Sequence, residues 1–253
     1  MPRVPDGAGP AELGLRPLTA RSVVLSTLLG HHPPELPARA LVRVGELFGI
    51  AEGTVRTALT RMVAAGDLRA HSGTYRLTGR LVARQARQDD SRAPRTRPWQ
   101  GDWEIALVTA ERRTPADRAA LRTAMAALRL AEAREGCWLR PANLVRDRPP
   151  VVTGQCAWLT GTPEDDPAAL AAALWDLDGW ARRARALAAA LDRRPGGLAE
   201  RFTVSAAVLR HLLADPVLPA PLLPADWPGE RLRGRYETFD RDFRALLLRH
   251  IGL

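Results

Sequence analysis

Two arginines and three threonines share one side of a helix predicted over residues 52–65. They are Thr54, Arg56, Thr57, Thr60 and Arg61. Five apolar residues of the same segment follow helical spacing and define an opposite, buried face: Val55, Ala58, Leu59, Met62 and Val63. Arginine can donate two hydrogen bonds to guanine in the major groove, and threonine offers a hydroxyl and a methyl that contacts thymine. The pattern therefore predicts a helix that reads DNA bases.

A helix-turn-helix is predicted around this segment. Residues 20–29 and 38–48 place leucines and valines at helical spacing, so each is expected to bury one face. Gly49 suits the left-handed conformation that ends a helix, and Ile50 can pack beneath the turn. Ala51, at the expected N-cap, lacks a capping side chain, and this absence typically costs about 0.5–2 kcal/mol.

A two-stranded hairpin is predicted directly after the DNA-reading helix. Strand-like residues 68–70 and 74–77 flank a Ser-Gly pair that suits a tight two-residue turn. Arg69 and Arg76 on these strands, with Arg21 at the first helix, are expected to contact phosphate and so fix the register on the duplex. The helices and the hairpin together predict a winged helix-turn-helix.

Positive charge is concentrated in the N-terminal part of the chain. The formal net charge is +9, and all 37 basic residues are arginine. Residues 1–100 carry 15 arginines against 8 acidic residues, a net +7. Counterion release would convert this excess into salt-sensitive affinity for DNA. An arginine-bearing helix face is also common on solvated surfaces, so a three-helix packing unit without a nucleic-acid role stays open as an alternative.

The chain is predicted to contain five successive parts and to have an α+β fold. The parts are a disordered tail (1–17), a winged helix-turn-helix DNA-binding domain (18–90), a linker (91–98), an α/β domain (99–177) and a helical domain (178–253) with a Pro-rich strap (215–229). The five prolines of the strap exclude regular helix and strand. Its leucines and Trp227 would be costly to leave in water, so the strap is expected to pack as an extended segment.

The α/β domain is predicted to be ferredoxin-like. Its expected elements are a strand ending at Ile105–Val108, a helix over 114–130 capped by Thr114, a strand at Cys137–Leu139, a strand within Val151–Leu159 and a helix over 166–174. The order strand, helix, strand, strand, helix fits a split βαβ arrangement.

Two alternative functions follow from the same domain. Ferredoxin-like folds also host metal-dependent nucleases, which need converging carboxylates at a strand end, and here only Glu111 follows the first strand. A non-catalytic protein-interaction module is the second alternative. Cys137 and Cys156 lack metal-ligand spacing and the five histidines are scattered, so no metal or cofactor is expected.

A cytoplasmic protein is expected from the hydropathy pattern. No apolar run approaches the roughly 18–20 residues that cross a bilayer, and the N-terminus lacks the apolar core of a signal peptide.

Three separated groups of motifs carry a family resemblance. They are Phe48–Leu68 with Tyr75–Thr78, Trp99–Trp103 with Gly136–Pro141, and Leu174–Leu177 with Asp215–Pro219 and Leu222–Gly229. Together they resemble the PaaX family of bacterial transcriptional repressors, which is best known for controlling phenylacetic acid catabolism. The Pro-rich strap, in its expected place, makes the resemblance specific.

The resemblance implies both an architecture and a mode of regulation. It implies a winged-helix N-terminal domain, a ferredoxin-like middle domain for dimerisation and effector binding, and a helical C-terminal domain. It also implies a homodimer that binds an inverted-repeat operator and is released by an aryl-CoA thioester such as phenylacetyl-CoA. For such an effector, Arg182 and Arg183 could hold CoA phosphates and Trp180 could line an aryl pocket.

Overall fold

The computed structural model describes residues 13, 15, 16, 18–193 and 197–252. The predicted disordered tail, residues 1–17, therefore lies almost wholly outside the described part of the chain. The fold is α+β and divides into two compact units. The first contains Met1–Arg92, Arg183–Leu213 and Gly229–Leu253, and the second contains Ala93–Arg182 and Ala214–Pro228. No helix among the described residues is long and apolar enough to span a membrane.

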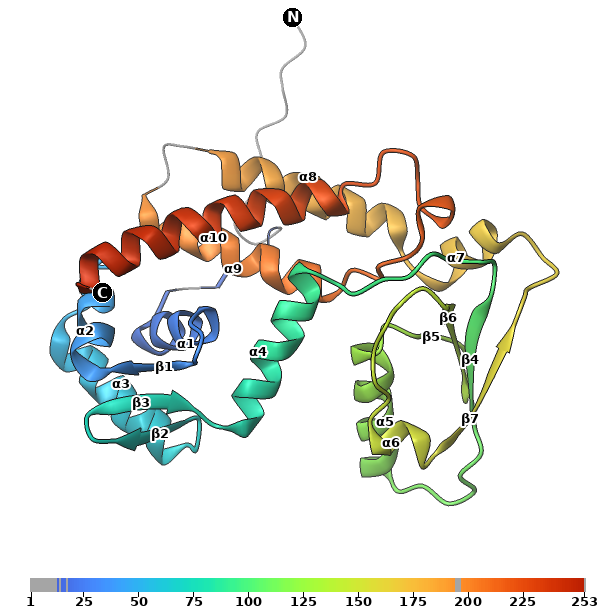
Figure 1. Ribbon diagram of the computed structural model, residues 1–253, viewed down its shortest axis with the longest axis horizontal. Coiled ribbons are helices and arrows are strands. Elements are labelled where there is room, and N and C mark those ends of the chain that lie inside the picture. Colours follow the sequence, from blue (N-terminus) through green and yellow to red (C-terminus); the bar gives the residue numbers. More distant parts are fainter. Residues whose placement is uncertain (1–12, 14, 17, 194–196, 253) are drawn as a thin grey trace, which may run out of the picture. The chain divides into compact units, whose positions relative to one another are not determined.

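The N-terminal part of the first unit consists of helices and a small sheet (Figure 1). Its elements are α1 (Ala20–Gly30), β1 (Glu35–Pro37), α2 (Ala38–Glu46), α3 (Glu52–Ala64), β2 (Leu68–His71), β3 (Thr74–Leu77) and α4 (Gly79–Arg92). The strands pair antiparallel in the order β1-β3-β2. Leu28, Leu41 and Leu59, one from each of the first three helices, are at most 1% exposed and form the core between them.

The turn between α2 and α3 depends on two glycines. Gly49 has a φ of +67°, the left-handed conformation predicted to end the helix. Gly45 lets the two helices approach closely, because a Cβ at this position would lie only 2.5 Å from Cγ2 of Val55. As predicted, Ala51 is the N-cap of α3 and its side chain makes no capping hydrogen bond.

The hairpin is extended by a strand that the sequence analysis did not predict. The turn residues Ser72 and Gly73 both have positive φ, +47° and +77°, as a tight hairpin turn of the predicted type requires. The additional strand, β1, pairs with β3 and brings Glu35 opposite Arg76. Leu36 of β1 is 1% exposed and closes the core beneath the sheet.

The C-terminal helices do not form an independent domain. The elements concerned are α8 (Leu177–Asp192), α9 (Leu198–Leu213) and α10 (Gly229–Ile251), and the boundary between the two units falls inside α8. Helices α9 and α10 pack with the N-terminal segment in the first unit. Phe48, next to the α2–α3 turn, has its ring centroid 4.9 Å from that of Phe202 and 6.2 Å from that of Phe243. The predicted separate domain over 178–253 is corrected accordingly, because the apolar faces of α9 and α10 are covered by N-terminal residues.

The second unit is built on a four-stranded antiparallel sheet (Figure 1). Its elements are β4 (Trp103–Val108), α5 (Pro115–Ala127), β5 (Ala131–Arg134), β6 (Cys137–Pro141), α6 (Pro150–Thr153), β7 (Cys156–Gly161) and α7 (Pro167–Leu174). The strand order is β5-β6-β4-β7. Residues of α5 and α6, including Leu121, Met125 and Val152, form a buried cluster with Ala106 and Trp138 of the sheet.

Two predicted elements of this unit are wrong in detail. The apolar run Val151–Leu159 is not one strand but the short helix α6 followed by β7. Pro150 occupies the first turn of α6, where proline is favoured, and Gly154 is its C-cap. Strand β5 was not predicted because its sequence, AEAR, has no β-branched or aromatic residue.

The Pro-rich strap packs in the second unit through apolar side chains and one buried arginine. Leu218 and Leu222 lie in a buried cluster with Trp103 of β4. Arg140 of β6 is 0% exposed and donates hydrogen bonds to the carbonyl groups of Pro216 and Val217, at 3.4 and 3.3 Å. Burial lowers the pKa of Arg140, and the backbone carbonyls around it compensate for the lost hydration.

The close approach of α2 and α3 predicts opposite effects for two Gly-to-Ala substitutions. G45A should lower the free energy of unfolding by about 1–3 kcal/mol, because the new methyl overlaps Val55, which is 1% exposed and has no room to move. G53A should raise it by about 0.5–1 kcal/mol, because a Cβ on this helical glycine meets nothing within 4 Å. Urea denaturation checks both, and equal effects of the two substitutions would contradict the packing described.

Candidate nucleic-acid interface

The predicted DNA-reading residues of α3 all lie on its solvent-exposed side. Each of the five is exposed: Thr54, Arg56, Thr57, Thr60 and Arg61. The opposite face is buried through Val55, Leu59 and Met62, which are each 1% exposed. The predicted buried face was too wide, because Val63 is 37% exposed and Ala58 is only half-buried. One side of α3 therefore presents hydroxyl and guanidinium groups to solvent.

Hydrogen bonds within α3 hold part of this face in place. The Nε of Arg56 donates to Oε1 of Glu52 at 2.7 Å. The hydroxyl of Thr57 donates to the Gly53 carbonyl at 2.8 Å, and that of Thr60 donates to the Arg56 carbonyl at 3.1 Å. An exposed ion pair four residues apart contributes only about 0.3–0.5 kcal/mol, so an anionic ligand can displace Glu52.

Arg61 differs from Arg56 in its surroundings. Among the residues that the structure describes, no carboxylate forms a salt bridge with Arg61. Its guanidinium group is exposed on the same face of α3, so all its donors can reach a nucleic acid without breaking an internal contact.

The hairpin carries a row of charges across its three strands. Arg69 of β2 lies opposite Arg76 of β3, which in turn lies opposite Glu35 of β1. The Nε of Arg76 is 2.8 Å from a carboxylate oxygen of Glu35. Two like charges facing each other across a strand pair are destabilising, and Glu35 offsets only one of them. Arg69 is thus the hairpin arginine with the greater need for an anion.

Arg21, predicted to contact phosphate, has an internal partner. Its Nη2 lies 2.6 Å from Oδ2 of Asp67, and Nη2 of Arg80 lies 2.5 Å from the other oxygen of the same carboxylate. The Asp67 side chain is 1% exposed, whereas those of Arg21 and Arg80 are 58% and 74% exposed. Arg21 therefore acts first as a clamp on a buried carboxylate.

The backbone of Asp67 joins the end of α3 to the end of the hairpin. Its N–H donates to the Met62 carbonyl at 2.9 Å, and its carbonyl accepts from the N–H of Thr78 at 3.1 Å. Gly66 before it has a φ of +70°. Sequence reasoning missed Asp67 and Arg80, although an acidic residue directly after the C-terminal glycine of a basic helix is a signal for such a pair.

The three residues expected to bind an effector lie on α8, and the structure does not gather them around one site. Trp180 is buried and stacks on Trp227, with ring centroids 4.5 Å apart and an interplanar angle of 17°. Arg182 and Arg183 are exposed, and Arg183 donates to the Leu13 carbonyl at 3.3 Å. One face of Trp180 is thus already covered by a neighbouring tryptophan.

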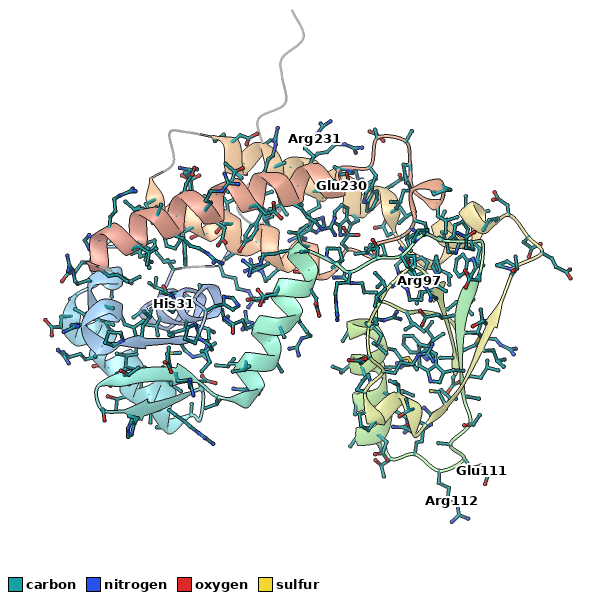
Figure 2. The ribbon with its side chains drawn as sticks, in the orientation of Figure 1. His31, Arg97, Glu111, Arg112, Glu230 and Arg231 are labelled. Atoms are coloured by element: carbon teal, nitrogen blue, oxygen red, sulfur yellow. The ribbon has the colours of Figure 1, made fainter. Side chains whose placement is uncertain are left out.

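The carboxylates near β4 do not form a cluster. Glu111 is exposed on the loop after β4, next to Arg112 (Figure 2). Glu104, in β4 itself, is 5% exposed and accepts hydrogen bonds from Arg146 at 3.1 and 3.2 Å and from Arg148 at 3.3 Å. Within the described part of the chain, no three His, Cys, Asp or Glu side chains lie close enough to hold a metal ion.

Comparison with known proteins identifies relatives over both ends of the chain. The family model described as PaaX-like protein matches residues 19–81, and the model described as PaaX-like protein C-terminal domain matches residues 174–251. Among solved structures, uncharacterized protein Rv0674 from Mycobacterium tuberculosis is 47% identical, with a TM-score of 0.77. The match covers 93% of this chain and 98% of that one. No curated protein matches the chain significantly.

The Asp67 clamp predicts a ranking of stability effects. Replacing both Arg21 and Arg80 by Ala should lower the free energy of unfolding by about 3–5 kcal/mol, because a buried charge is left without a partner. D67N should cost less, about 1–3 kcal/mol, because the two arginines it leaves behind remain exposed to water.

Urea denaturation at neutral pH measures both effects. The control is D90N, on the exposed side of α4, which should stay within about 0.5 kcal/mol of the parent chain. A double arginine variant as stable as the control would contradict the clamp.

Proposed function

The chain belongs to the PaaX-like protein family, and on that basis we propose that it is a DNA-binding transcriptional regulator of phenylacetic acid catabolism that acts as a repressor. The observation that carries the proposal is the exposed arginine and threonine face of α3, opposite a face buried against α1 and α2. A helix of this kind can enter the major groove while its domain stays folded behind it.

The head of the first unit is proposed to be a winged helix-turn-helix. Helices α2 and α3, the turn at Gly49 and the β2–β3 hairpin follow one another in the order that this motif requires. In this assignment α3 is the recognition helix, and the hairpin is the wing. The second unit is proposed to be a ferredoxin-like domain, which is supported by the antiparallel strand order β5-β6-β4-β7 with α5 and α6 over one face.

The proposed contacts to DNA divide into two kinds. Arg61 and Arg56 contact base edges, with Thr54, Thr57 and Thr60 contributing shorter hydrogen bonds or methyl contacts. Arg56 has to leave Glu52 to do so, so Arg61 is the stronger candidate for a bidentate contact to guanine. On the wing, Arg69 and Arg76 contact phosphate. Arg21 contributes to register mainly by holding Asp67, and through it the end of α3.

Repression is proposed to act by occupancy of an operator. A homodimer would place two copies of α3 in successive major grooves of an inverted repeat. An aryl-CoA thioester such as phenylacetyl-CoA would release the complex by favouring a conformation whose recognition helices no longer match the half-site spacing. The expected effector residues Trp180, Arg182 and Arg183 remain part of this proposal as one site for that thioester.

The direct test is a binding titration with DNA from the region upstream of the protein's own gene. Specific binding that weakens steeply with salt supports a DNA-binding regulator, because released counterions dominate the salt dependence. A protein-interaction module would give no specific complex at either of two salt concentrations. Cleavage of the DNA on addition of Mg²⁺ or Mn²⁺ would instead favour a nuclease.

Replacing Arg61 by Ala should weaken operator binding by about 1–3 kcal/mol, roughly 5- to 150-fold in Kd, and relax the preference at one base pair. The reason is that its guanidinium group has no internal salt bridge to fall back on. Fluorescence anisotropy with a set of single-base operator variants measures both. R231A is the matched control, since Arg231 is an exposed arginine at the start of α10 (Figure 2) and should leave binding unchanged. Equal binding by both variants would reject the assignment of Arg61.

Replacing Arg69 by Ala should weaken binding to all DNA sequences by a similar factor. A phosphate contact carries no base preference, and its loss should reduce the slope of log K against log salt by about 1. Titrations of operator and unrelated DNA at several salt concentrations give the slope. If R69A changed specificity but not the salt slope, Arg69 would be contacting a base instead of phosphate.

A further inference from the structure

A cavity of about 390 Å³ lies within the first unit, enclosed by residues of α1, α4, α9 and α10. Its volume falls in the range of small-molecule binding sites, roughly 300–1,000 Å³. His31, which follows α1 and is labelled in Figure 2, also lines the cavity. None of the residues expected to bind an effector on α8 lines it.

One part of the cavity wall is aromatic. Phe202 of α9 and Phe243 of α10 have ring centroids 5.2 Å apart, and Phe239 stacks on Phe243 at 5.9 Å with an interplanar angle of 8°. All three rings line the cavity, together with Leu25 and Leu247. Aromatic pairs at these separations favour the addition of another flat ring. This part suits an aryl or other apolar group.

Another part of the wall is a cluster of arginines that repel one another: Arg16, Arg21, Arg84 and Arg210. The pKa of Arg84 is lowered by burial and then by the positive charges of Arg87, Arg16 and Arg21. The pKa of Arg210 is lowered by burial and then by Arg16, Arg183 and Arg84. No described carboxylate raises the pKa of Arg84 or Arg210. A half-buried cluster of like charges favours the binding of an anion.

Two other cavity arginines are already compensated. Arg92 and Arg244 share Asp240, at 3.3 and 2.9 Å. The cluster around Arg84 thus differs from the remaining arginines of the same cavity in needing negative charge. In addition, the hydroxyl of Thr27, which lines the cavity and is 5% exposed, has no hydrogen-bond partner among the described atoms. Buried polar groups without partners are rare in folded proteins, so this one also favours a ligand acceptor.

We propose that this cavity is the effector site, and that it binds an amphipathic anion whose apolar aryl or acyl group lies against the phenylalanines while its carboxylate or phosphate lies at the Arg16, Arg21, Arg84 and Arg210 cluster. The assignment rests on the proposed function, and it places the ligand in the first unit instead of at Trp180, Arg182 and Arg183 on α8. A free aryl carboxylate and its CoA thioester share the required chemistry.

Both parts of the cavity contact residues that hold α3. Arg21 belongs to the arginine cluster and also binds Asp67 at 2.6 Å, so a ligand anion competes with Asp67 for the same guanidinium group. At the aromatic part, Phe202 and Phe243 contact Phe48, which directly precedes the turn into α3. A bound ligand therefore favours a conformation in which α3 is held differently, which is the condition for an effector to change DNA affinity.

The test is isothermal titration of the full-length protein with phenylacetyl-CoA, phenylacetate and CoA as separate probes. Binding of either aryl compound, with CoA alone binding at least about ten-fold more weakly, supports the cavity, and the stronger aryl probe identifies the source of the anion. R84A should weaken binding of that probe about ten-fold or more, whereas R87A, an exposed arginine on the same helix outside the cavity, should not.

A second variant separates ligand binding from folding. Ala206 lines the cavity, so A206F should fill it and block the probe, while α3 and its DNA affinity stay intact. The wild type should release DNA on addition of the probe, and both R84A and A206F should bind DNA but resist release.

Three results would overturn the proposal. They are the absence of any heat of binding with all three probes, unchanged affinity in both R84A and A206F, or loss of binding in R182A with R84A unaffected. In each case DNA binding by the wild type would keep the proposed regulatory function standing. Loss of DNA binding with intact ligand binding would instead remove the regulatory function and leave the cavity assignment.

Discussion

The contact on which the N-terminal head depends is the Asp67 carboxylate held between Arg21 and Arg80. Asp67 sits where α3 ends and the hairpin begins, and its side chain is 1% exposed. A buried carboxylate is tolerated only when it is paired, so α1, the end of α3 and the start of α4 are held in one arrangement. The exposed face of α3 can present guanidinium and hydroxyl groups in a fixed direction because its own end is fixed this way.

The same contact links the head to the cavity. Arg21 belongs to an arginine cluster that favours an anion, and it also satisfies Asp67. Phe48 provides a second link, because its ring contacts α9 and α10 immediately before the turn into α3. The C-terminal helices thus form the wall behind the head, and sites on α9 and α10 can influence α3 without touching DNA.

Local features of the structure were predictable, and long-range ones were not. The 3.6-residue spacing around Leu59, the left-handed glycine at 49 and the Ser-Gly turn at 72–73 are determined by neighbouring residues, and each was predicted. The pairing of Arg21 with Asp67 joins residues 46 positions apart, and the stacking of Phe48 on Phe202 joins positions further apart still, so no local pattern indicates either. For that reason the cavity and the grouping of α9 and α10 with the head were missed.

The central claim is that α3 and the hairpin form the surface that contacts DNA. Hydrogen–deuterium exchange of the full chain, with and without DNA from upstream of its own gene, tests this most directly. The account predicts that protection on binding is strongest over residues 52–64 and 68–77. Protection confined to the sheet strands of the second unit, with none over α3, would contradict it.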